Sequence, residues 1–115
     1  MFEFAYNDII DDSPSAMRAQ ERQALDAIIH LLRDASTKGP KSVEAVNALY
    51  QLRRLWGVFL DDLKGPENGL PDSLRARLIS IGIWVNKEIE RIRSGATSDL
   101  TPLIEINQII RDGLN

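Results

Sequence analysis

The chain has 115 residues, about the size of one compact domain, so we expect a single hydrophobic core. Hydrophobic residues make up 43% of it and charged residues 27%, which is typical of a globular protein and not of a disordered one. The net charge of −3, the absence of cysteine and the lack of a long apolar run argue against a nucleic-acid binder, a disulfide scaffold and a membrane span, respectively.

The first predicted segment is an N-terminal arm, residues 1–12. It contains acidic residues but no Lys or Arg, unlike the start of a secretory signal, so we expect a cytoplasmic protein. Phe2, Phe4 and Tyr6 alternate with the period of a strand, although the apolar residues of this stretch also fit helical spacing. We interpret the segment as an arm docked on a helical domain.

The first helix is predicted at about residues 14–37. Ser13 is a suitable N-cap residue, and Pro14 suits the first helical position because the N–H that proline lacks has no helical partner there. Apolar residues then recur at steps of three and four, as a single buried face requires. Gly39 and Pro40 are expected to end the helix.

The second helix is predicted at about residues 42–64, with Ser42 as its N-cap. Its apolar residues, which include Tyr50 and Trp56, surround most of the helix and leave only a narrow polar stripe. A helix with this pattern is either central in its own domain or covered by a partner. The pattern does not decide between these two positions.

The third and fourth helices are predicted at about residues 71–94 and 101–112. Pro71 can open the third helix, and Gly95 is the residue type most often found just after a helix end. The fourth helix begins near Thr101, and no segment of the chain requires a strand. We therefore predict an all-α fold, a four-helix, bundle-like single domain with a short N-terminal arm.

The middle of the third predicted helix is apolar on more sides than one core face requires. Ile79 and Ile83 lie more than a quarter turn from the residues of the core face, and Trp84 adds a further apolar side. One explanation is a helix buried within its own bundle, and the other is a groove for a partner helix. The candidate partner-binding residues of the second and third helices are Tyr50, Trp56, Ile79, Ile83 and Trp84.

Two charged residues interrupt apolar arcs, Arg53 on the second predicted helix and Glu88 on the third. A partly buried charge is costly unless it is paired, so we predict an ion pair between Arg53 and either Glu88 or another inward carboxylate such as Glu105. The alternative is that Arg53 lays its aliphatic stem over the core and places its guanidinium group in solvent.

No sequence motif for catalysis, nucleotide binding or metal binding is present. Asp26, His30 and Asp34 lie four residues apart on one helical face, a spacing that could hold a weakly bound metal ion. That face is opposite the apolar side of the helix, so we interpret these residues as a solvated charged stripe. We expect no cofactor, no metal site and no enzymatic activity.

Several segments of the chain carry a family resemblance. They are ERQAL at 21–25, ALYQLRRLWGVFLDDL at 48–63, PENGLP at 66–71, LRARLISIGIWV at 74–85 and PLIEINQIIRDGL at 102–114. In this order, and over nearly the whole chain, the sequence resembles the flagellar biosynthesis regulator FlaF family.

The resemblance implies a cytoplasmic regulator of flagellin synthesis and secretion that acts beside the translational regulator FlbT and engages flagellin itself. Flagellin has amphipathic terminal helices, and a helical protein with spare apolar surface could cover them. The leading expectation is thus an adaptor or chaperone that binds flagellin and promotes its synthesis and export.

The alternative is a post-transcriptional regulator of flagellin translation that acts through the repressor FlbT or through flagellin messenger RNA. Four bases near the ends of the third predicted helix could contact phosphate, namely Arg75, Arg77, Arg91 and Arg93. The acidic net charge argues against direct RNA binding.

Overall fold

The computed structural model describes residues 14–113, with side chains from residue 19 onward. This part of the chain forms four helices and no strand, which confirms the predicted all-α fold. The helices are α2 (Pro14–Lys38), α3 (Val43–Lys64), α4 (Asp72–Arg93) and α5 (Thr101–Asp112). The predicted arm at residues 1–12 lies outside the described residues.

Local hydrogen bonds define the helix ends. The Ser42 side chain caps α3 by accepting a 3.1 Å hydrogen bond from the backbone N–H of Ala45. After α4, Gly95 has a φ of +83°, and the N–H of Ala96 donates to the carbonyl of Arg91 at 2.8 Å. This pattern is a Schellman motif, in which a positive φ makes glycine the favoured residue.

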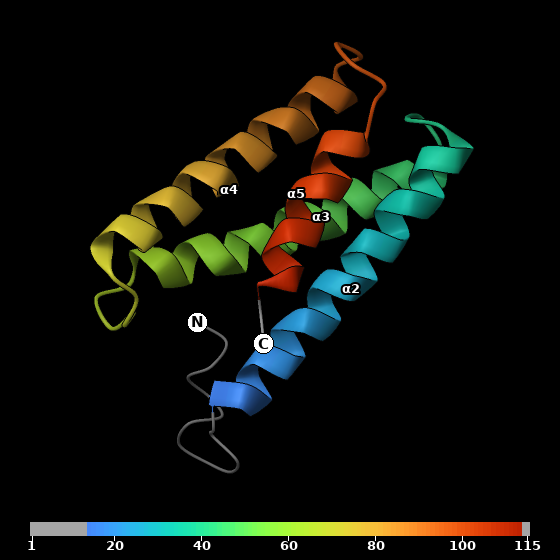
Figure 1. The fold of residues 1–115 in the computed structure, drawn as a ribbon. Coiled ribbons are helices and arrows are strands. Elements are labelled where there is room, and N and C mark those ends of the chain that lie inside the picture. The colour runs from blue at the N-terminus through green and yellow to red at the C-terminus, as the bar shows by residue number, and fades with distance from the viewer. Residues whose placement is uncertain (1–13, 114–115) are drawn as a thin grey trace.

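Helix α3 is the central element of the fold. It packs on α2 along one side and on α4 along another, and α5 lies over it between α2 and α4 (Figure 1). Neighbouring helices therefore explain only part of the apolar character of α3, because Val43, Val46, Tyr50 and Val58 remain exposed. The largest fully buried apolar side chains of the core are Leu25, Leu32, Leu52, Trp56, Val85, Ile89, Leu100 and Leu103.

Trp56 lies in this core, where α5 crosses α3. Its side chain is 1% exposed, and its indole N–H donates a 2.8 Å hydrogen bond to the Asn107 side-chain oxygen. Asn107 is itself fully buried and donates to the carbonyl of Leu103 at 2.7 Å. The expectation that Trp56 binds a partner is therefore wrong for this fold, because α5 covers it and satisfies its polar atom.

Candidate partner-binding groove

An apolar groove of about 450 Å³ lies between α4 and α5. In Figure 1 these two helices leave the loop at residues 94–100 and separate toward their far ends. Because α4 packs on α3 while α5 packs on α2, each wall of the groove is supported from behind. The lining residues are Ser80, Ile81, Trp84, Pro102, Glu105, Ile106 and Ile109.

The groove keeps large apolar side chains in contact with solvent. Trp84 of α4 is 39% exposed and Ile109 of α5 is 64% exposed. Single exposed hydrophobic residues are common on protein surfaces, but here an indole and an isoleucine from different helices line one hollow. The fold thus leaves a continuous apolar surface uncovered on this side.

The α4 wall is positioned by a close approach to α3 at Gly82. A Cβ atom at this position would lie 2.6 Å from Cδ2 of Leu60 and 2.9 Å from its Cγ, well inside van der Waals contact. Glycine lets the two helices meet, and Val85 and Ile89 then bury their side chains completely or almost completely. The opposite side of α4, which carries Trp84, is left for the groove.

The α5 wall is tied down at both ends. At its start, the backbone N–H of Thr101 donates a 2.9 Å hydrogen bond to the Asp99 carboxylate. At its end, Nε of Arg111 lies 2.7 Å from the carboxylate of Asp26 on α2. Hydrogen bonds from the side chain and then the backbone of Thr101 lower the pKa of Asp99. The hydrogen bond from Arg111 lowers the pKa of Asp26.

The predicted partner-binding residues are distributed over four environments. Trp84 lines the groove, whereas Trp56 is in the core. Ile83 is 48% exposed and Ile79 is half-buried, and both lie on α4 outside the groove lining. Tyr50 is 58% exposed on α3, where the Arg54 guanidinium lies 5.8 Å from the centre of its ring. The structure therefore does not bring the five residues into one surface.

The predicted ion pair between Arg53 and Glu88 is wrong, because each residue has a different partner. Glu88 is 5% exposed and accepts a 2.8 Å hydrogen bond from Arg91, one turn further along α4. Arg53 is at the surface and pairs with Glu90. Glu90 lies two residues after Glu88, so the two side chains point to different sides of α4. Glu90 therefore reaches the exposed guanidinium of Arg53, whereas Glu88 does not. Glu105 lines the groove instead.

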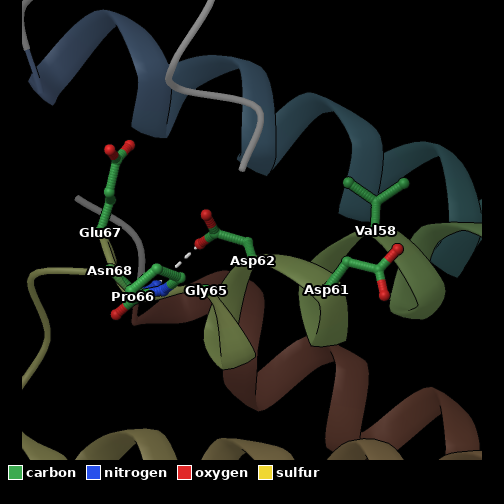
Figure 2. Close-up of a pocket in the computed structure, with 7 residues that line it drawn as sticks. All are labelled: Val58, Asp61, Asp62, Gly65, Pro66, Glu67 and Asn68. Carbon is green, nitrogen blue, oxygen red and sulfur yellow. Dashed lines mark hydrogen bonds between the residues drawn. The ribbon is translucent and has the colours of Figure 1, made fainter.

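A second pocket lies at the end of α3 and in the turn that follows it (Figure 2). Asp62 points toward Asn68 and accepts a 2.8 Å hydrogen bond from it, while Asp61 points in another direction. Adjacent helical positions differ by about 100°, so these carboxylates do not form an acid and base couple. Among residues 14–113, no cluster of His, Cys, Asp or Glu side chains could hold a metal ion.

Sequence reasoning missed the contribution of α5 to the groove. Ile109 is exposed and lines the groove, whereas the buried residues of α5 are Leu103 and Asn107. Ile109 is six residues from Leu103, about 120° around the helix, so helical geometry alone could have separated it from the core face. No pattern in the sequence indicated that Asn107 is a core residue, because its side-chain oxygen is paired with Trp56, which is distant in the chain.

Comparison with known proteins gives one family. The family model described as flagellar protein FlaF matches residues 2–114. No curated protein and no solved structure shows a significant match to the chain. In the part of the chain that the structure describes, none of the helices combines the length and the hydrophobicity needed to cross a membrane.

Proposed function

This chain belongs to the FlaF family of flagellar proteins, which places its role in flagellum biogenesis, and we propose that it performs this role by binding flagellin. The protein acts in the cytoplasm as an adaptor or chaperone and not as an enzyme. It promotes the synthesis and secretion of flagellin by holding one of its amphipathic helices in the groove between α4 and α5.

One observation carries this proposal, the exposed apolar surface that Trp84 and Ile109 form between two supported helices. Helical recognition in a groove requires a concave apolar surface with defined walls, and α4 and α5 provide it. Tryptophan is enriched among the residues that contribute most to protein–protein affinity, because it buries a large rigid surface. An amphipathic flagellin helix would cover this exposed apolar surface. In the bound state, the apolar face of the flagellin helix could not associate with other flagellin molecules.

The proposal is tested by co-purifying the full chain with flagellin from the same cells and measuring the affinity. We expect the wild-type protein to bind and the double substitution Trp84→Ala, Ile109→Ala to weaken binding by about tenfold or more. The matched control is Val43→Ala, Val46→Ala, which removes two apolar side chains of equal or greater exposure from α3. The control variant should bind as the wild type does.

Two results would contradict the proposal in different ways. If the folded wild-type protein does not bind flagellin at all, the proposed function is wrong. If the α3 variant loses binding while the groove variant retains it, flagellin binds elsewhere on the molecule. Circular dichroism of each variant separates these outcomes from a loss of folding.

The alternative, control of flagellin translation through FlbT or flagellin messenger RNA, receives less support from the charges of α4. Three of the four arginines that could contact phosphate are already paired with acids. Arg75 pairs with Asp72, Arg91 with Glu88 and Arg93 with Glu90. A site that binds phosphate would lose affinity steeply as the salt concentration rises, whereas an apolar helix contact would not. One salt titration with flagellin messenger RNA therefore distinguishes the two functions.

A further inference from the structure

Helical spacing places exposed bases beside the α4–α5 groove on α4 and exposed carboxylates on α5, and this pattern limits the chemistry of its occupant. We propose that the groove takes an amphipathic helix of mixed charge, with carboxylates along the edge next to α4 and basic residues along the edge next to α5. That the natural occupant is a flagellin helix rests on the proposed function. The charge pattern itself is argued from helical spacing and exposure, independently of flagellin.

The α4 wall is basic. Arg77 lies seven residues before Trp84, and Lys87 lies seven residues after Ser80, so both share the helical face that lines the groove. Both side chains are exposed, and neither forms an ion pair within residues 14–113. The α4 edge therefore presents two positive charges that are available to a bound carboxylate.

The α5 wall is acidic. Glu105 lines the groove, is exposed and forms no ion pair with any described residue. Asp112 follows seven residues later on the same face, beyond the groove lining. Its side chain is 60% exposed, lies 3.6 Å from Arg111 and accepts a 2.9 Å hydrogen bond from Gln108. Between these charged edges lie only apolar side chains and Ser80. The groove thus has an apolar floor, one basic edge and one acidic edge.

This arrangement also fixes the direction in which a helix can bind. A helix whose apolar stripe faces the floor exchanges its left and right flanks when its direction is reversed. A partner with acids on one flank and bases on the other consequently matches the groove in one direction only. The 12 residues of α5 span about 18 Å, enough to contact roughly three turns of the bound helix.

The experiment uses three synthetic helical peptides of about 14 residues, a length that covers these turns. All share one Leu and Ala stripe, and their flanks carry Glu on one side and Lys on the other, Glu on both sides, or Lys on both sides. We expect the wild-type protein to bind the mixed peptide about tenfold more tightly than either uniform peptide, because each exposed pair contributes a fraction of a kcal/mol. The preference should shrink as salt rises.

Charge reversal on α4 provides the decisive comparison. The double substitution Arg77→Glu, Lys87→Glu makes both walls acidic, so the variant should prefer the peptide with Lys on both flanks. The control Lys41→Glu, Lys64→Glu changes the net charge equally at exposed positions of the loop after α2 and the end of α3. It should keep the wild-type preference for the mixed peptide.

Several outcomes would overturn the inference without touching the proposed function. Equal affinity for all three peptides, or an unchanged preference after α4 reversal, would show that the wall charges do not select the occupant. Self-association of the protein that is lost in Trp84→Ala would identify a second copy of the chain as the occupant. Conversely, if flagellin does not bind but the peptide preference switches as expected, the groove chemistry is right and the flagellin assignment is wrong.

Discussion

The two tryptophans mark regions of the molecule that are built differently. Trp56 lies at the crossing of α3 and α5, is 1% exposed and donates its N–H to Asn107. Trp84 lies on the groove side of α4 and is 39% exposed. Both occur in helices that are apolar on several sides, so the difference comes from the placement of α5. That helix crosses in front of α3 and diverges from α4 (Figure 1), and its Asn107 bonds the buried Trp56 whereas Trp84 lines the open groove.

The comparison shows how one helix can close a core and open a binding surface. The buried face of α5, with Leu103 and Asn107, completes the interior. A neighbouring face, with Ile106 and Ile109, forms one wall of the groove. In the proposed function, stability and recognition depend on different faces of the same 12-residue element. Substitutions can separate the two roles.

The largest effect is expected from Trp56→Ala compared with Trp84→Ala. Removing the buried indole should lower the free energy of unfolding by about 3–5 kcal/mol, because it leaves a cavity and an unpaired Asn107 oxygen. Removing the half-exposed indole should cost less than about 2 kcal/mol. Denaturant unfolding of both variants measures the difference. Equal losses would mean that Trp84 is as well enclosed as Trp56, and the groove would not exist in solution.

A second comparison concerns the two glycines that lie inside helices, Gly57 of α3 and Gly82 of α4. A Cβ atom at Gly57 meets nothing within 4 Å, so Gly57→Ala should raise the free energy of unfolding by about 0.5–1 kcal/mol through helix propensity. At Gly82 the same gain is opposed by the clash with Leu60. We expect Gly82→Ala to be less stable than Gly57→Ala by about 1–3 kcal/mol. Identical midpoints in urea would show that α4 does not approach α3 this closely.

The smallest effect is the acid sensitivity of the α5 wall. Because Arg111 lowers the pKa of Asp26, this pair stabilises the fold above the ordinary aspartate value of 3.8 and loses its contribution as the pH falls through the lowered value. The stability advantage of the wild type over Asp26→Asn should therefore be constant near neutral pH and disappear in acid. Unfolding curves at several pH values measure it. In an Arg111→Gln background, Asp26→Asn should have little further effect at any pH.

The positions of the helices were predictable because local chemistry decides them. Ser42 caps α3, Gly95 ends α4 with a positive φ, and apolar spacing identifies the buried faces. The candidate site was predictable only in part. Trp84 stood out as excess apolar surface on α4, but its partner surface on α5 was missed. Two predictions were wrong, the place of Trp56 on the binding surface and the ion pair between Arg53 and Glu88. Both depended on which helix lies opposite each of these residues.

The residues alone were enough to predict that this protein is helical, where its helices begin and end, and that it belongs to the FlaF family. These properties follow from hydrogen bonds, spacing and residue identities within short stretches of chain. Which apolar faces are covered depends instead on how the four helices pack against one another. The crossing of α5 over α3, the contact between Gly82 and Leu60 and the groove that Trp84 and Ile109 line together all join residues distant in sequence. Their relation depends on packing, which local periodicity does not specify.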